Sequence, residues 1–145
     1  MRRRHFLVGV GAAMLLPQSA LAQTSPVDDL VRAATRGAPA RKARVKLDLP
    51  VLADNGNSVA MKVSVDSPMT AADHVKSIRL LSDRNPVPEM ATFHLGPRAG
   101  RAEIASRVRL AGSQNVVAVA ELSDGSFWFD VANVIVTLSA CLDES

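Results

Sequence analysis

The sequence predicts an all-β protein, an immunoglobulin-like antiparallel β-sandwich of seven or eight short strands preceded by a short N-terminal helix. Three observations predict this fold. From residue 45 onward, apolar and polar residues alternate with the period of two that half-buried strands require. Turn-forming residues interrupt the alternation at short intervals, and no helical stretches separate the strands as they do in α/β proteins. Only four Phe and one Trp are present, which favours a compact sandwich over a barrel that encloses a ligand.

Residues 1–22 are predicted to be a twin-arginine signal peptide. They contain the pattern Arg3-Arg4-His5-Phe6-Leu7, an apolar stretch over 6–16, and the small-x-small sequence Ala20-Leu21-Ala22. Cleavage is expected after Ala22 and places the mature protein in the periplasm, with a Sec signal as the alternative. The apolar stretch is shorter than the roughly 20 residues that span a bilayer, so no membrane attachment is expected after cleavage.

The mature part, residues 23–145, is expected to form one domain with one core. Subtracting the 22 signal residues from 145 leaves 123, the size of an ordinary single domain. Removing the three signal arginines from 17 Lys+Arg leaves 14 basic residues against 14 Asp+Glu. The mature chain is therefore close to neutral, and its bulk charge makes no case for nucleic-acid binding.

A short helix and a linker are predicted over 23–42. Ser25 is a suitable N-cap, Pro26 suits the first helical position, and Asp28 stands three residues after the cap. An apolar stripe at helical spacing follows, and Gly37 and Pro39 then end the helix. The basic cluster that begins at Arg41 is interpreted as a solvated entrance to the first strand rather than as a binding patch.

The β-sandwich is predicted over 43–138. The clearest strands are 45–49 and 59–65, separated by turn-forming residues at 54–57. Two prolines at 86 and 88 require a loop over 83–88, and Asp124-Gly125 predicts a tight hairpin. The other strands are expected at 74–82, 89–95, 102–110, 115–122, 127–130 and 133–138.

The sequence contains no constellation that is typical of a self-sufficient enzyme. No phosphate-binding loop, metal-binding His-Glu pair or nucleophile-elbow serine is present in the mature part. His74 and His94 fall in or beside predicted strands, where a histidine is more often packed or solvated than catalytic. With one Cys and three His in the whole chain, we expect no metal site and no cofactor. A cysteine-dependent redox enzyme would also lack a visible base and a resolving cysteine.

Cys141 is the residue that could carry chemistry. It follows the last predicted strand, in a segment over 139–145 that we call the arm, where few neighbours can bury it. An exposed cysteine keeps a small thiolate fraction at neutral pH, and the thiolate is the nucleophile. An arm could also be inserted into the active site of another protein. The alternatives are an inert thiol and a disulfide-linked dimer through Cys141.

The mature chain resembles the SoxY family, the sulfur-carrier subunits of the thiosulfate-oxidising Sox system. The resemblance covers most of the mature chain and ends on the terminal cysteine. The stretches that carry it, in order, are Asn55-Gly56-Asn57-Ser58-Val59, Val65-Asp66-Ser67-Pro68-Met69-Thr70, Asn85-Pro86-Val87-Pro88-Glu89, Ala91-Thr92-Phe93-His94, Gly100-Arg101-Ala102-Glu103 and Gln114-Asn115-Val116-Val117-Ala118-Val119-Ala120-Glu121.

The resemblance implies an immunoglobulin-like fold and a carrier that is not itself an enzyme. The family cysteine, which matches Cys141, bears the sulfur substrate covalently while separate enzymes oxidise and hydrolyse it. The implied partners are a SoxZ-like β-sandwich subunit, which forms a heterodimer with the carrier, and a periplasmic sulfur-oxidising cytochrome and hydrolase. A twin-arginine signal fits this arrangement, because a folded pair could be exported with only one signal.

The arm departs from the family pattern around its cysteine. The family arm usually reads Gly-Gly-Cys-Gly-Gly, whereas this chain has Ser139 and Ala140 before Cys141 and Leu142 after it, followed by two acidic residues. Ser139 and Ala140 are small and preserve some of the thinness of a glycine arm. Leu142 adds bulk, and the nearby carboxylates are expected to disfavour the thiolate and anionic sulfur species. The alternative function is therefore a non-carrier binding or assembly module that pairs with a second β-sandwich subunit.

Overall fold

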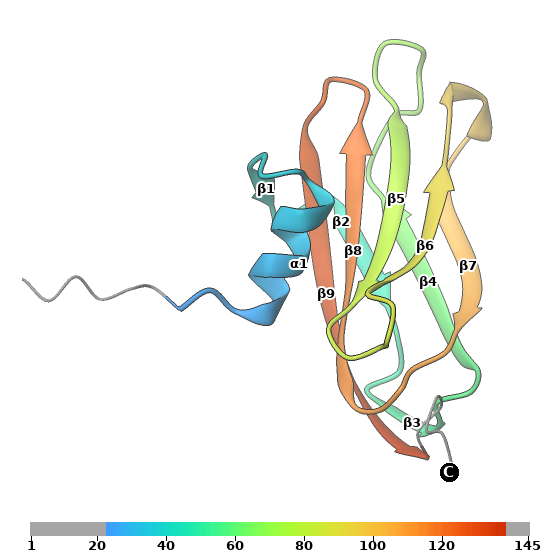
Figure 1. Ribbon diagram of the computed structural model, residues 1–145. Helices are drawn as coiled ribbons and strands as arrows, with labels where there is room; N and C mark the ends of the chain where they lie inside the picture. Colours follow the sequence, from blue (N-terminus) through green and yellow to red (C-terminus); the bar gives the residue numbers. More distant parts are fainter. Residues whose placement is uncertain (1–22, 139–145) are drawn as a thin grey trace, which may run out of the picture.

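The computed structural model describes residues 23–138, and this part of the chain is a sandwich of two β-sheets with one helix on its outer face (Figure 1). The prediction of an all-β immunoglobulin-like sandwich with a short N-terminal helix is confirmed. The described residues contain nine strands, because two short strands were not predicted and the last two predicted strands form one. The elements are α1 Pro26–Ala34, β1 Ala40–Arg41, β2 Val45–Asp48, β3 Leu52–Asn55, β4 Val59–Val65, β5 Val75–Ser82, β6 Glu89–His94, the 3₁₀ turn η1 Pro97–Ala99, β7 Ala102–Val108, β8 Gln114–Leu122 and β9 Phe127–Leu138.

The two sheets differ in size. The larger sheet has the order β1-β9-β8-β5-β6, and β3 also pairs with β9; the smaller sheet has the order β2-β4-β7. All pairs are antiparallel except β1 with β9 and β3 with β9, which are parallel. Since β5 and β9 are both antiparallel to β8, they run in the same direction, and the sandwich has one end where β9 begins and another where β9 ends.

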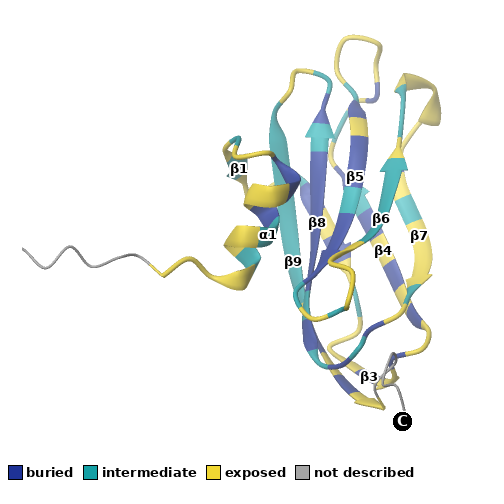
Figure 2. Cartoon of the chain, in the orientation of Figure 1, coloured by how far each residue is buried: buried dark blue, intermediate teal, exposed yellow. Residues whose placement is uncertain are grey.

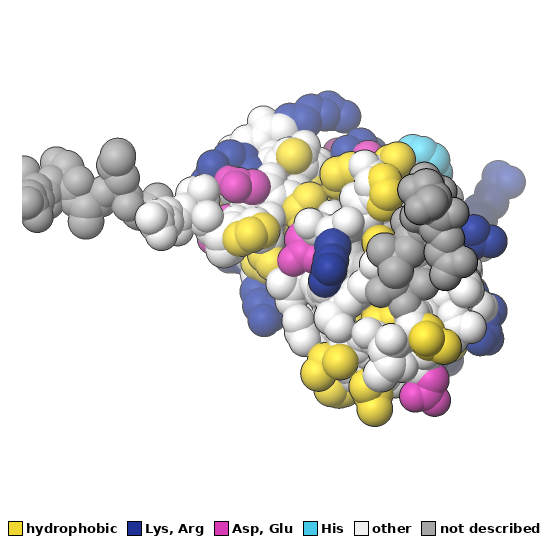
Figure 3. All heavy atoms as spheres, turned by 60° about the horizontal axis from the view of Figure 1, so that its bottom comes forward, with side chains coloured by type: hydrophobic (Ala, Val, Ile, Leu, Met, Phe, Trp, Pro, Cys, Tyr) yellow, Lys and Arg dark blue, Asp and Glu magenta, His cyan; other side chains and the backbone are white. Residues whose placement is uncertain are grey.

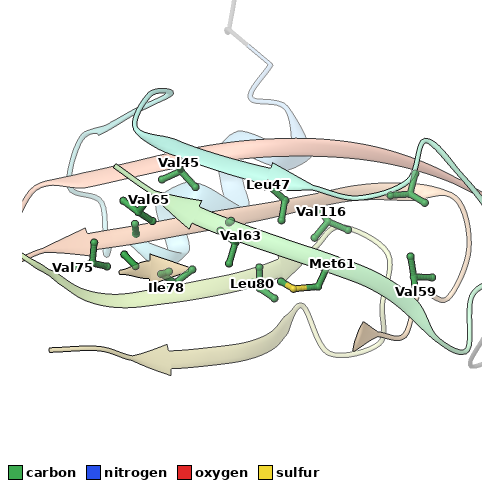
Figure 4. Close-up of a cluster of buried hydrophobic side chains, with 14 of the residues drawn as sticks. Val45, Leu47, Val59, Met61, Val63, Val65, Val75, Ile78, Leu80 and Val116 are labelled. Carbon is green, nitrogen blue, oxygen red and sulfur yellow. The ribbon is translucent and has the colours of Figure 1, made fainter. Parts of the chain in front are cut away.

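Strand alternation places the core between the sheets. In β4, alternate residues from Val59 to Val65 are buried, and their side chains meet those of β2, β5 and β8 (Figure 4). β8 is buried over most of its length because the smaller sheet covers one of its faces and α1 covers part of the other (Figure 2). Ile78 and Leu80 of β5 are fully inaccessible to solvent.

The helix begins where the sequence predicts. The Ser25 hydroxyl accepts a hydrogen bond from the Asp28 backbone N–H at 3.2 Å, and Asp28 Oδ2 accepts one from the Ser25 backbone N–H at 3.2 Å, which completes a capping box. Val31 and Ala34 then pack against the outer face of the larger sheet, next to Val117. Burial of this stripe fixes the helix, since nine residues are too few for a stable isolated helix.

The final strand is longer than the sequence suggests. Two strands, 127–130 and 133–138, were predicted, but β9 is continuous and pairs with β8 through Val131 and Ala132. Asp130 does not end the strand because its Oδ2 accepts a hydrogen bond at 2.9 Å from the backbone N–H of Leu47 in the smaller sheet. The carboxylate therefore joins the two sheets.

Two short strands were not predicted. β1 lies in the predicted linker, and β3 includes residues 54 and 55, which were assigned to a turn. Both strands pair with β9, which lies far away in the sequence, so no local pattern announces them. No helix within the described residues has both the length and the apolar character needed to cross a bilayer.

Replacing Leu80 with Ala tests the position of the core. Leu80 is 0 % exposed, so Leu80→Ala is expected to lower the free energy of unfolding by about 2–5 kcal/mol through lost burial and a residual cavity. Leu138→Ala is the matched control, because Leu138 is 65 % exposed and its truncation should change stability by less than about 0.5 kcal/mol. Urea unfolding measures both, and equal losses would contradict this description of the core.

Candidate functional site at the end of strand β9

The residues predicted to carry chemistry lie just past the described part of the chain. Ser139, Ala140, Cys141 and Leu142 fall outside residues 23–138, as does the predicted signal peptide. Leu138, the last residue of β9, is three positions before Cys141. The structure thus describes the base from which the arm departs.

The arm departs from a well-anchored strand end. The backbone N–H of Gly56 donates to the carbonyl of Leu138 at 2.7 Å, and the Thr137 hydroxyl donates to the carbonyl of Asp54 at 2.8 Å. At the start of β3, the Ile135 N–H donates to the carbonyl of the preceding residue, Val51, at 2.8 Å. These bonds hold the end of β9 against β3, so the position of Leu138 is set by the sandwich.

A polar network joins the loops at the same end. Asn85 Oδ1 accepts hydrogen bonds from the Ala111 N–H at 2.8 Å and from Gln114 Nε2 at 3.0 Å, while Asn85 Nδ2 donates to the Arg109 carbonyl at 2.8 Å. The Ser82 hydroxyl donates to Gln114 Oε1 and accepts from two backbone N–H groups of its loop. The described residues leave no buried side-chain nitrogen or oxygen without a partner. This end of the sandwich is therefore cross-linked by satisfied hydrogen bonds.

The two histidines lie at the opposite end of the sandwich. His74 precedes β5 and His94 ends β6, where β9 begins rather than ends. His74 Nδ1 lies 3.1 Å from the Thr70 carbonyl, and His94 is exposed. Neither is near Leu138. Within residues 23–138, no three His, Cys, Asp or Glu side chains come together as a metal site would require.

A second polar site, which the sequence did not reveal, surrounds Trp128 at the end of the sandwich where β9 begins. The guanidinium groups of Arg41 and Arg44 lie 5.9 and 5.2 Å from the indole centre, in cation–π geometry. Arg41 and Trp128 also line a cavity of about 370 Å³ beside the hairpin. Arg41 is nonetheless exposed, as predicted for the basic cluster, whereas Arg44 is half-buried against the ring. The sequence contains a single Trp, and it lies far along the chain from Arg41 and Arg44, so no local pattern predicts their contact.

The hairpin beside Trp128 has its own hydrogen-bond chain. Trp128 Nε1–H donates to the Ser126 hydroxyl at 3.0 Å, and that hydroxyl donates to Asp124 Oδ1 at 2.6 Å. The Ser126 hydroxyl and then its backbone N–H hold the pKa of Asp124 below its ordinary value. Asp124 therefore stays ionised further into the acidic range and continues to fix the turn.

A family model and several solved structures match most of this chain. The family described as "SoxY: Sulfur oxidation protein SoxY" matches residues 31–141. The chain belongs to the SoxY family. The match covers most of the sandwich and ends on Cys141, which is the single cysteine of the chain. A search of curated proteins finds no match.

Solved structures agree with the SoxY assignment. The sulfur carrier protein SoxY from Chlorobium limicola f thiosulfatophilum is 27 % identical, with a TM-score of 0.62, and the match covers 78 % of this chain and 97 % of that chain. A superoxide reductase (neelaredoxin) from Ignicoccus hospitalis is 17 % identical, with a TM-score of 0.57, covering 65 % of this chain and 80 % of that one. The second likeness shows a shared fold alone. The predicted family and fold are thus confirmed, and the chain is similar to a sulfur carrier.

The Asn85 network makes a testable contribution to this SoxY fold. Asn85→Ala is expected to lower the free energy of unfolding by about 1–3 kcal/mol, because it leaves partly buried groups of the neighbouring loop without partners. In this variant, hydrogen exchange of the Ala111 amide should speed up relative to the wild-type protein, and by more than exchange of core amides does. Asn133→Ala is the control, since Asn133 is exposed and makes one side-chain bond to Asn115. An Asn85 variant as stable as the control would show that the network contributes nothing.

The acidic hairpin predicts a pH effect of defined sign. A depressed folded-state pKa means that ionised Asp124 stabilises the hairpin above its unfolded pKa and that this contribution disappears as pH falls through the folded pKa. Ser126→Ala should raise the Asp124 pKa toward its ordinary value, and Ser126→Thr, which keeps the hydroxyl, should retain most of the shift. NMR titration of the carboxyl carbon measures this, and an unchanged midpoint in Ser126→Ala would disprove the proposed cause.

Proposed function

We propose that this protein is a covalent carrier of sulfur intermediates in the oxidation of thiosulfate, with the intermediate attached to Cys141. One observation supports this most directly: the SoxY match runs to residue 141 and ends on the single cysteine of the chain. The likeness over 97 % of a solved sulfur carrier protein supports the same function.

The base of the arm suits a carrier. A carrier must present a small reactive group to several enzymes while the rest of the protein stays folded. The bonds from Gly56 and Thr137 hold the end of β9 to β3, so forces on the arm are transmitted to the sandwich rather than unravelling the last strand. The sandwich acts as the handle, and Cys141 acts as the point of attachment.

The proposed chemistry places all catalysis in the partners. In loading, the Cys141 sulfur and the outer sulfur of thiosulfate form an S–S bond; the thiol proton leaves, and a periplasmic cytochrome accepts the two electrons that are released. In unloading, a hydrolase directs water to the sulfonate sulfur, sulfate and a proton leave, and Cys141 retains a persulfide. The carrier itself supplies only a nucleophilic sulfur, which must be accessible in its thiolate form.

The proposed partners and compartment follow from the same assignment. A SoxZ-like β-sandwich subunit forms the heterodimer, and the cytochrome and hydrolase act on the arm in turn. The twin-arginine signal over 1–22 directs the protein to the periplasm, where cleavage after Ala22 removes it. No metal or organic cofactor is required of the carrier for this chemistry.

The second candidate is an assembly module that pairs with a second β-sandwich subunit without carrying sulfur. The observation that favours it is the arm sequence, since Leu142 and the acidic residues after it replace the family glycines. Under this alternative, Cys141 either links two copies through a disulfide or has no role. Non-reducing electrophoresis detects such a link directly.

Intact-mass analysis of the mature protein from cells grown on thiosulfate tests the proposal. We expect adducts of sulfur and of thiosulfonate on the wild-type chain, loss of both on reduction, and their absence in Cys141→Ser. The mass should also begin at Gln23. Cys141→Ser should still pair with its β-sandwich partner, because the substitution changes no residue of the described core. A wild-type mass without adducts under these conditions would refute carriage and favour the assembly module.

A further inference from the structure

An exposed apolar surface surrounds the base of the arm. Four of the five large hydrophobic side chains exposed within residues 23–138 lie on β3, directly before it, or at the end of β9. We call them the arm-base patch: Val51 at 72 % exposure, Leu52 at 57 %, Ile135 at 50 % and Leu138 at 65 %. Figure 3, which brings this end of the molecule forward, shows hydrophobic side chains at several places on it.

Parallel pairing of β3 with β9 brings two of these side chains together. Leu52 is paired with Ile135, so their side chains stand side by side on one face. Val51 is tied to the same position, since its carbonyl accepts the Ile135 N–H at 2.8 Å. Leu138 lies three residues after Ile135, so it belongs to the other face of β9, and it is exposed where the strand ends.

The strand edge beside this surface favours contact with another protein. β3 is an edge strand, and proteins commonly protect edges with charged side chains or proline. Here the row of β9 that faces solvent carries Asn133, Ile135 and Thr137, and the neighbouring β3 contributes Leu52 and the charged Asp54. None of the four salt bridges among the described residues involves β3 or β9. Apart from Asp54 this edge is uncharged, and exposed apolar side chains on such an edge are typical of a contact surface.

The length of the arm limits what the partner can be. Cys141 stands three residues beyond Leu138, and a fully extended chain advances about 3.3–3.6 Å per residue, so the Cys141 backbone lies within roughly 11 Å of Leu138. Any protein that reaches the sulfur on Cys141 must therefore approach the surface around Leu138. A subunit bound permanently to the patch would obstruct that approach.

We propose that the arm-base patch is the docking surface for the enzymes that act on the sulfur attached to Cys141, and that it receives an apolar rim around their active-site openings. This inference rests on the proposed function. The patch is small, as suits a carrier that must dissociate from one enzyme before it meets the next. Affinity is kept low while the short arm makes the docking geometry specific.

Substitutions that keep the fold test the proposal in cells oxidising thiosulfate. The variant Leu52→Thr with Ile135→Thr removes two neighbouring apolar side chains but keeps β-branched residues suited to strands. The matched control is Val87→Thr, which removes a side chain 68 % exposed on the loop after β5. β8 separates β5 from β9, which puts that loop roughly 10 Å away across the sheet.

The measurement is the rate at which Cys141 acquires adducts after a pulse of thiosulfate, followed by intact mass. We expect the patch variant to load at least about fivefold more slowly than wild type and the Val87 control to load at the wild-type rate. Alkylation of Cys141 by iodoacetamide in the purified proteins should proceed at the same rate in all three, because the thiol itself is unchanged.

Three outcomes would overturn the proposal. Equal loading of the patch variant and wild type would show that enzymes do not use the patch. Loss of the β-sandwich partner from the patch variant on size exclusion would reassign the surface to the permanent heterodimer. Wild type that acquires no adduct would refute carriage and the docking proposal together, whereas an adduct that forms equally in all variants would refute docking alone.

Discussion

The pairing of β9 with β8 is the interaction on which the rest of the structure depends. It runs without a break from Gln114 opposite Val134 to Glu121 opposite Phe127. β8 is the most buried strand and forms the centre of the larger sheet, so β9 is held against the most buried part of the sheet. Strand β9 then extends beyond its pairing with β8, and its last residues, up to Leu138, precede the arm. The register of this one pair therefore sets the path of β9 toward Leu138, three residues before Cys141.

The two ends of β9 have different chemistry. At its start, Trp128 packs beneath Arg41 and Arg44 and donates to Ser126, which makes a compact polar corner. At its end, β3 supplies hydrogen bonds and exposed apolar side chains, and the Asn85 network ties down the loops nearby. In the proposed carrier, the well-anchored end of β9 is the one that precedes Cys141.

Asp130 explains how a polar residue fits in the middle of the longest strand. Its carboxylate accepts a hydrogen bond from the N–H of Leu47 and so links the two sheets. Its backbone remains in the ladder with β8. From the sequence, an Asp between apolar residues indicated the end of a strand. Such a partner is invisible to local patterns, since only the packing of the two sheets brings β2 beside β9.

The sequence by itself determined the class of the fold, the helix and its cap, the antiparallel strands of the core and the family, because each depends on local alternation, turn residues or ordered motifs. It also predicts Cys141 as the reactive residue, and this stays a prediction because Cys141 lies outside the described residues. Only the tertiary structure decided that Leu52 lies against Ile135, that Gly56 holds Leu138, and that apolar side chains surround the base of the arm. The physical reason is that parallel pairing joins residues distant in the chain, and its register depends on the packing of the whole sandwich rather than on any one segment.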